Sequence, residues 1–337
     1  MREPCSTSLP YFFSTNLSTM TFAGSKVFMT GATGYTGLVI AEHAVKAGHQ
    51  VRGLSRSSTG DQKLQAIGAI PVRGDLSSLD TMRGESSNAD VVMHLAWIHD
   101  FQMDYDEVLK IDKAAVAALA KPLKGTQKPL LYTSVTSLVQ PDPSGGETME
   151  DAPEVENPLL RRMAAERSAL EWVDLGVRLV VIRLPPYVYG CGGSVFLPML
   201  MQQAVKHKRS IYPEAGNIHT TDVHVDDAAR LYLLAAEKAA AGEVFNGTTG
   251  TTVTVRQMAE AIAKTTGYPA VSVSRDEAVE LWGEFLVNFV CIENRASSRK
   301  AQEQMGWRPR EASMLTDLVE GSYVETAKRL KDEGGGT

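Results

Sequence analysis

Three glycines near the start of the chain have the spacing of a phosphate-binding turn. In the stretch VFMTGATGYTGLVIAEHA, Gly31, Gly34 and Gly37 lie between an apolar run and a segment of helical periodicity. Gly31 permits a tight turn, Gly34 allows backbone amides to approach a pyrophosphate, and Gly37 allows close helix packing above a partly positive helix N-terminus. Glycine-rich turns also serve only as turns. This strand-turn-helix context nevertheless predicts a dinucleotide site that includes Thr33 and Tyr35.

The end of the second predicted strand, in QVRGLSRSS, indicates which dinucleotide is bound. NAD-binding sheets usually carry an acidic residue there, which accepts hydrogen bonds from the ribose hydroxyls. Here Ser55 occupies that position and Arg56 follows it. An arginine can pair with a 2′-phosphate that a carboxylate would repel, so the sequence predicts NADP (as NADPH) in preference to NAD. The alternative is a solvated surface arginine.

The elements that position these residues alternate short apolar runs with helical segments, which is typical of a parallel sheet covered by helices on both faces. The predicted strands are KVFMT, QVRGLS, IPVRG, ADVVMHLA, PLLYTS, VRLVVIRL and EVFNGT. We expect an α/β fold, a doubly wound parallel (Rossmann) sheet with a smaller, mostly helical C-terminal substrate lobe. The predicted parts are a disordered extension over 1–24, a Rossmann domain over 25–190 and 222–250, a substrate lobe over 191–221 and 251–331, and a frayed tail over 332–337.

The composition limits the classes of partner. A formal net charge of -6 leaves no basic excess to neutralise a nucleic-acid backbone, so no nucleic acid is expected. No apolar run approaches the ~18 residues that would span a bilayer, so no membrane association is expected. Three scattered cysteines and seven histidines lack metal-ligand spacing, which predicts no metal site. These features favour a cytoplasmic protein with a small-molecule substrate, and they allow a homodimer.

Further motifs follow the glycine turn in a fixed order: GDL at 74–76, HLA at 94–96, RLPPYVYG at 183–190, VHVDDAARLYLLAAEK from Val223, and GWRP at 306–309. Together they resemble the extended branch of the short-chain dehydrogenase/reductase superfamily, with its NAD-dependent epimerase/dehydratase-like, dihydroflavonol-reductase-like and atypical members. The likeness covers Lys26 to Lys331. The resemblance implies six further cofactor contacts, namely Asp75 and Leu76 at the adenine, Leu95 and Ala96 at the nicotinamide ribose, and Pro185 and Pro186 at the nicotinamide.

The catalytic motif of that superfamily is absent. Its reductases use Tyr-x-x-x-Lys as the acid, with a Ser or Thr hydroxyl that polarises the carbonyl oxygen. Alignment on the AAE at 164–166 puts Arg162 at the lysine position and Pro158 at the tyrosine position. The serine position falls on Val135, between the candidate hydroxyls of Ser134 and Thr136. Any proton donor must therefore come from another part of the pocket.

Two other side chains are candidate donors. His99 stands beside Asp100 in HLAWIHDFQMDY, and a neighbouring carboxylate can tune an imidazole to titrate near neutrality, although such a pair also serves to cap helices. Tyr187 in PPYVYG is the second candidate, whereas the resemblance implies a structural role for Tyr189.

Arg162 also has two interpretations. It can form an i, i+4 ion pair with Glu166 on a helix face, which we favour, or it can hold the cofactor near its ribose. The Met-rich segment VFLPMLMQQAV is either core or the lining of an apolar substrate pocket.

The sequence thus predicts an NADP-dependent oxidoreductase acting on CH-OH groups, specifically a secondary alcohol or ketone of an apolar small molecule, with an atypical proton donor. Two alternatives stay open, because a fold does not fix its chemistry. One is a non-redox isomerase, cyclase or lyase on the same fold. The other is a catalytically silent nucleotide-binding sensor.

Overall fold

The computed structural model describes residues 24–100, 102–156, 161–250 and 252–334. Its centre is a parallel seven-stranded sheet in the order β10-β6-β5-β4-β1-β2-β3. The strands are β1 (Lys26–Thr30), β2 (Gln50–Ser55), β3 (Ile70–Arg73), β4 (Val91–His94), β5 (Pro129–Val135), β6 (Arg178–Leu184) and β10 (Val244–Asn246). All seven predicted strands are therefore confirmed. The strand order reverses between β1 and β4, and open α/β sheets bind ligands beyond the carboxyl ends of the strands at such a point.

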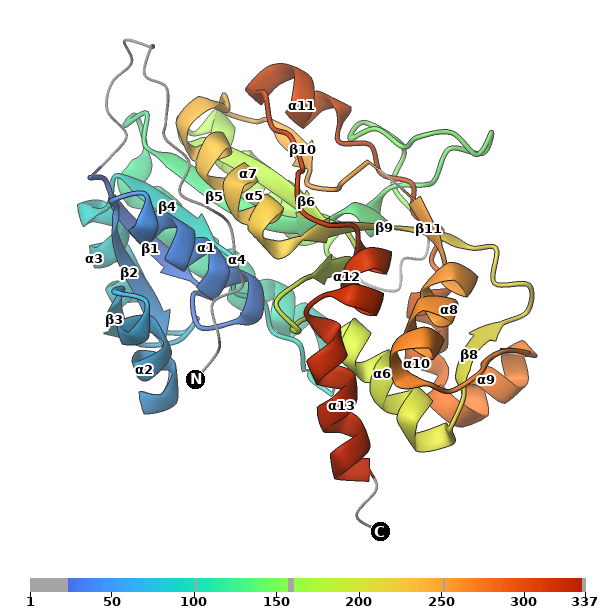
Figure 1. The fold of residues 1–337 in the computed structure, drawn as a ribbon. Helices are drawn as coiled ribbons and strands as arrows, with labels where there is room; N and C mark the ends of the chain where they lie inside the picture. Colours follow the sequence, from blue (N-terminus) through green and yellow to red (C-terminus); the bar gives the residue numbers. More distant parts are fainter. Residues whose placement is uncertain (1–23, 101, 157–160, 251, 335–337) are drawn as a thin grey trace.

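Helices cover both faces of this sheet, as Figure 1 shows. One face carries α1 (Tyr35–Lys46), α2 (Ser58–Ala66) and α7 (Val225–Lys238). The other face carries α3 (Leu79–Asn88), α4 (Tyr105–Ala120) and α5 (Met163–Asp174). Short 3-10 turns, η1 (Lys121–Leu123) and η2 (Thr136–Leu138), flank β5. The doubly wound fold class is confirmed.

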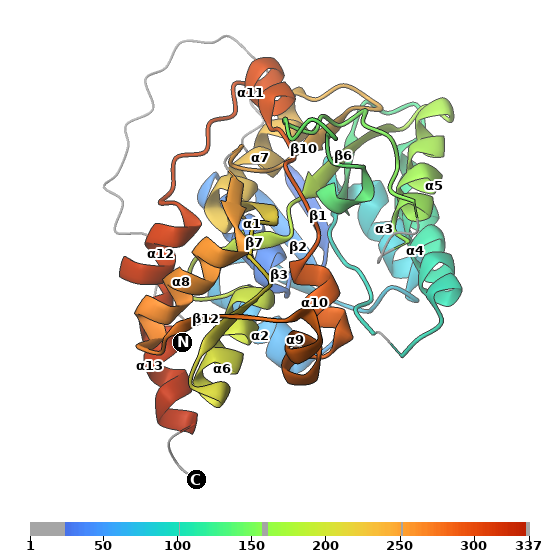
Figure 2. The same cartoon turned by 90° about the vertical axis from the view of Figure 1, so that its right-hand side faces the viewer.

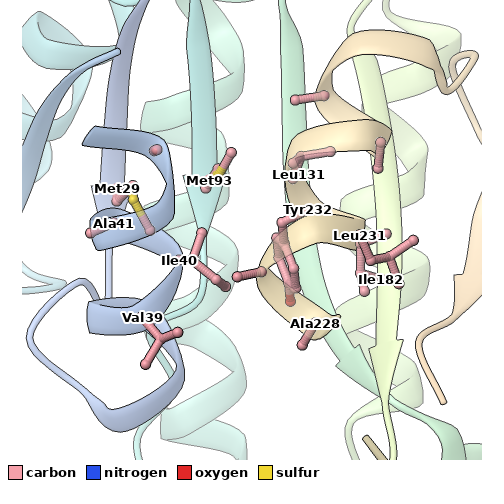
Figure 3. Packing of buried hydrophobic residues seen from close by; sticks show 14 of the residues in the cluster. Met29, Val39, Ile40, Ala41, Met93, Leu131, Ile182, Ala228, Leu231 and Tyr232 are labelled. Atoms are coloured by element: carbon pink, nitrogen blue, oxygen red, sulfur yellow. The ribbon is translucent and has the colours of Figure 1, made fainter. Parts of the chain in front are cut away.

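The strands are apolar along their length because both of their faces are buried. In β1, Val27 and Met29 point into one core cluster and Phe28 points into the other, as the two-residue period of a strand requires. In Figure 3, Ile40 from α1 and Tyr232 from α7 lie over the first of these faces. This packing fixes α1, and with it the glycine turn, against the middle of the sheet.

A smaller lobe is built mostly from the C-terminal part of the chain, and Figure 2 shows its helices gathered together. Its helices are α6 (Phe196–His207), α8 (Val255–Thr266), α9 (Arg275–Trp282), α10 (Glu284–Val290), α12 (Met314–Glu320) and α13 (Tyr323–Gly334). A two-stranded sheet pairs β8 (Ser210–Pro213) with β12 (Ala270–Val273), and a three-stranded sheet orders β11 (Thr252–Thr254), β9 (His219–His224) and β7 (Tyr187–Tyr189). The Met-rich segment forms α6, whose Leu197, Leu200 and Met201 are buried in the lobe's own core. Among the described residues, no helix is long and apolar enough to cross a bilayer.

The start of α7 fastens the C-terminal segment to the sheet. The Asp227 carboxylate accepts the backbone N–H groups of Arg310 and Glu311, each at 3.0 Å. The indole of Trp307 donates to the Asp227 carbonyl at 3.0 Å, just beyond α11 (Arg299–Met305). His224 caps the helix by accepting from the N–H of Asp226 at 3.2 Å. These contacts give the acidic pair in VHVDDAA a structural role.

Candidate functional site

Each of the three glycines in the turn after β1 is required, or open to a ligand, for a different structural reason. Gly31 has a φ of +71°, and a Cβ there would lie 2.7 Å from the Ala96 nitrogen. A Cβ on Gly37 would overlap the carbonyl oxygen of Gly31, so α1 packs this closely only with glycine. A Cβ on Gly34 would meet only the Gly31 oxygen, at 3.3 Å. The side of the turn at Gly34 is thus open to a ligand.

The N-terminus of α1 fits a diphosphate. Gly34 is its N-cap residue, and no side chain caps the helix. The first-turn amides of a 12-residue helix therefore face this open side without a side-chain acceptor. Such amides, together with the helix dipole, bind phosphate oxygens. The residues present fit the dinucleotide that the sequence predicts.

Two other segments meet the glycine turn at the carboxyl edge of the sheet. Leu95 donates its N–H to the Thr30 carbonyl and Ala96 donates to the Thr30 hydroxyl, both at 3.3 Å, so the end of β4 lies directly beside the turn. The Tyr35 hydroxyl donates to the Gly190 carbonyl at 2.8 Å, in the loop after β7. This bond links the turn to the segment that follows Pro185 and Pro186, whose rings are buried and half-buried, respectively.

The end of β2 presents no carboxylate. Ser55 is fully buried and its hydroxyl donates to the Ser57 carbonyl at 3.1 Å. Arg56 is exposed, and within the described ranges its guanidinium makes no hydrogen bond or ion pair. Thr33 packs near here, because a Cβ on Gly60 would lie 3.1 Å from its methyl group. The end of β2 therefore offers the cation of Arg56, and a serine where a carboxylate would accept the hydroxyls of the adenosine ribose.

The predicted adenine contacts, Asp75 and half-buried Leu76, follow β3. Asp75 accepts the N–H and the hydroxyl of Ser77 at 2.9 and 2.6 Å through its Oδ1. These hydrogen bonds lower the pKa of Asp75 and fix the turn, so one carboxylate oxygen is occupied locally.

Arg162 does not pair with Glu166, so that prediction is wrong. Glu166 is buried on the face of α5 that packs on the sheet, where Arg183 of β6 donates to it at 2.6 Å from Nη2 and at 3.1 Å from Nε. Arg162 is 7% exposed and donates from Nη2 to the Thr133 carbonyl at 2.8 Å. Its guanidinium carbon lies 4.1 Å from the centre of the Trp97 ring. Arg162 is thus a buried cation at the carboxyl end of β5.

The structure places the two predicted donors in unfavourable surroundings. His99 lies at the surface of the loop after β4, and partial burial of its ring and the charge of Arg162 lower its pKa. Asp100 accepts the N–H of Gln102 at 2.9 Å and thereby closes a turn. Tyr187 is 1% exposed in the core of the small lobe, where burial raises its pKa. Its ring packs edge-on against Phe289 at 5.8 Å.

The two candidate hydroxyls on either side of Val135 point to different surroundings. Ser134 is fully buried, and in the described part of the chain its hydroxyl has no hydrogen-bond partner. Thr136 donates to the Asn294 side chain at 3.2 Å, which ties η2 to the segment before α11. Pro158, at the position of the catalytic tyrosine, lies outside the described residues.

A buried network of hydrogen-bonded polar side chains lies beneath the glycine turn, and the sequence did not reveal it. The Thr30 hydroxyl lies 2.7 Å from Nδ1 of His94, and Nε2 of His94 lies 3.2 Å from Oδ1 of Asp112. The Tyr132 hydroxyl donates to Oδ2 of Asp112 at 3.0 Å. This polar network joins β1, β4 and β5 to α4. The sequence feature that could have revealed this network is Asp112, an acid on the same helix face as the buried apolar residues Val108, Val116 and Leu119.

Comparison with known proteins agrees with this fold. Residues 27–246 match the model of the NAD dependent epimerase/dehydratase family. An uncharacterised protein of Schizosaccharomyces pombe is 37% identical over 298 residues, which cover 88% of this chain and 99% of that one. The 4-hydroxy-2-methyl-3-oxo-4-farnesyl-3,4-dihydroquinoline-1-oxide ketoreductase of Stigmatella aurantiaca is 28% identical over 252 residues, or 73% of this chain and 74% of that one.

Among solved structures, the UDP-glucose 4-epimerase of Thermotoga maritima aligns with a TM-score of 0.73 and 20% identity, over 90% of this chain and 99% of that one. The fold and the site define a Rossmann-type protein of the nicotinamide-dinucleotide-dependent class. The chain belongs to the NAD dependent epimerase/dehydratase family.

Proposed function

We propose that this protein is an NADP-dependent reductase that converts a ketone of an apolar small molecule to a secondary alcohol. The observation that carries the choice of nucleotide is the end of β2, where Ser55 is buried and bonded to Ser57 and where the exposed Arg56 has no anion. A 2′-phosphate would supply that anion. The adenosine ribose of NAD would find no carboxylate at Ser55 to accept its hydroxyls.

The chain's own residues divide the work of binding. The amides around Gly34 hold the diphosphate, because no side chain caps α1. Leu95 and Ala96 border the nicotinamide ribose on one side, and Pro185 with Pro186 border the ring on the other. When bound, the reduced nicotinamide would supply a hydride to the carbonyl carbon of the substrate.

Two observations support an apolar ketone as the substrate. The similar ketoreductase of Stigmatella aurantiaca bears the name of a 3-oxo substrate with a farnesyl group. The second is the composition of the small lobe, whose buried core is aliphatic and aromatic and includes Leu200, Met258 and Phe289. A lobe of this character suits a hydrocarbon chain better than a charged one.

Calorimetric titration of NADPH and NADH tests the choice of nucleotide. We expect Arg56→Ala to weaken NADPH binding roughly 10- to 100-fold, which corresponds to the loss of one charge-assisted contact, and to leave NADH binding unchanged. Lys63→Ala, which removes another exposed cation from the same region, is the matched control and should have little effect on either. Equal losses for both nucleotides, or none, would overturn the assignment.

A spectrophotometric assay with NADPH and ethyl acetoacetate, or longer 3-oxo esters, tests the reaction class. Oxidation of NADPH that depends on the ester supports the reductase. Conversion of a substrate without net change in the nicotinamide absorbance would instead indicate a non-redox isomerase, cyclase or lyase. Binding of NADPH without any turnover would indicate a sensor.

A further inference from the structure

Two buried polar groups near the carboxyl ends of β4 and β5 lack partners. They are Nε of Arg162 and the hydroxyl of Tyr105, the first residue of α4, and neither has a hydrogen-bond acceptor or donor within residues 24–334 as far as the structure describes them. A buried unsatisfied polar group costs about 1–3 kcal/mol, and such groups in a native fold call for an explanation. A ligand that bonds to both would supply one.

The acids near Arg162 are already engaged. Glu166 binds Arg183, and Asp112 binds His94 and Tyr132. Arg162 itself donates only to a backbone carbonyl, that of Thr133. A guanidinium that is 7% exposed and has no carboxylate partner among the described residues can stabilise negative charge that develops beside it.

Trp97 brings the two groups together. The Arg162 guanidinium carbon lies 4.1 Å from the centre of the Trp97 ring. The Tyr105 ring lies 6.2 Å from the same ring, at an interplanar angle of 50°. Arg161 covers the Tyr105 ring at 5.7 Å. A phenol and two guanidinium groups therefore surround the loop that follows the predicted nicotinamide contacts Leu95 and Ala96.

The charges around Tyr105 act on its ionisation in opposite directions. Burial raises the pKa of Tyr105 above its ordinary value and outweighs the positive charges of Arg162 and Arg161, which lower it, while the negative charge of Asp112 raises it further. A cation beside a phenol is the arrangement that makes the phenol a better acid, because it stabilises the phenolate. Of the other candidate donors, Tyr187 lies in the apolar core of the small lobe, and His99 is exposed in the loop after β4.

We propose that Tyr105 is the proton donor of this enzyme, and that the charge of Arg162, on the shared neighbour Trp97, stabilises its phenolate. The inference rests on the proposed reductase function. The bound reduced nicotinamide would supply a hydride to the carbonyl carbon, and the electron pair of the C=O π bond would move to the oxygen. That oxygen takes the proton of the Tyr105 hydroxyl, which gives the alcohol, and the phenolate regains a proton from solvent. A tyrosine on α4 thus replaces the one that α5 lacks.

Ultraviolet difference titration tests the pair without any turnover. The chain has ten tyrosines, so the titration of Tyr105 is obtained as the difference between the wild type and Tyr105→Phe. The same difference in an Arg162→Met background should show the pKa of Tyr105 higher by about one unit or more, since a close cation is removed. Arg162→Lys should restore most of the shift. An unchanged titration in Arg162→Met would overturn the inference, whether or not a good substrate is known.

Single-turnover reduction of ethyl acetoacetate gives the second readout. Tyr105→Phe should retain NADPH affinity and lose roughly 10²- to 10⁴-fold in the rate of hydride transfer, the usual contribution of a general acid. Tyr268→Phe in the small lobe is the matched control, and its rate should stay at the wild-type value. A Tyr105→Phe rate within threefold of the wild type, with roughly equal NADPH affinity, would overturn the inference alone. Absence of NADPH binding by the wild type would remove the proposed function instead.

Discussion

Removing either partner of the buried ion pair between Glu166 of α5 and Arg183 of β6 should strongly destabilise the protein. The side chains are 2% and 5% exposed, and Arg183 donates to the carboxylate from two nitrogens while its Nη1 donates to the Glu150 carbonyl at 2.8 Å. Glu166→Leu leaves the guanidinium buried without its anion. We expect a loss of about 3–5 kcal/mol in the free energy of unfolding.

The size of this effect is measurable in two ways. An unfolding entropy of about 2 cal/mol/K per residue over 337 residues converts a loss of about 4 kcal/mol into a fall of roughly 6 °C in Tm. Urea denaturation followed by circular dichroism should show the same loss as a lower midpoint with an unchanged slope. Arg183→Met should cost a similar amount, because it leaves a buried carboxylate.

The double variant Glu166→Leu/Arg183→Met separates the pair from its surroundings. Because two buried charges lose their hydration together, replacing both by apolar groups should cost less than either single change. Glu260→Gln, which breaks an exposed pair with Arg256 on α8, is the control and should cost under about 0.5 kcal/mol. A single Glu166→Leu loss below about 1 kcal/mol, or a double-variant loss equal to the sum of the singles, would refute the reasoning.

Two further predictions concern the glycine turn and the small lobe. Gly37→Ala should weaken NADPH binding at least about tenfold in calorimetry, since its Cβ would overlap the Gly31 oxygen and displace α1, whereas Gly84→Ala in α3, where a Cβ meets nothing within 4 Å, should leave binding unchanged. Burial raises the pKa of Asp222 to about 7, above its unfolded value near 3.8. The contribution of Asp222 to the free energy of unfolding is therefore fully present below about pH 4 and is lost as the pH rises through 7. Asp222→Asn should match the wild type near pH 4 and be more stable at pH 8, by on the order of 4 kcal/mol in urea denaturation, and equal stabilities at pH 8 would contradict the assignment.

Much of the architecture could be predicted from local pattern. The seven apolar runs became the seven strands of the sheet, because a strand buried on both faces needs nearly continuous apolar sequence. Gly176, with a φ of 82°, follows α5 in the left-handed conformation that commonly places glycine just after a helix. The motif order identified the family without any coordinates.

The candidate site was only partly visible in the sequence. Tyr105 and Asp112 are seven residues apart and share one face of α4, which helical spacing alone would have shown. The partner of each charge was not visible. Helical spacing favoured Glu166 as the ion-pair partner of Arg162, but Glu166 instead pairs with Arg183, which is 17 residues away in sequence on a strand packed against α5.

The sequence by itself determined the glycine-rich strand-turn-helix, the absence of an acid at the end of β2, and the family, because each depends on residues close together in the chain. Only the tertiary structure decided which buried charges are paired, that Tyr187 lies in the core of the small lobe, and that Trp97, Tyr105 and Arg162 converge at one edge of the sheet. Those outcomes depend on which elements pack together. Contacts between distant segments follow from the burial of whole faces, and no local spacing encodes them.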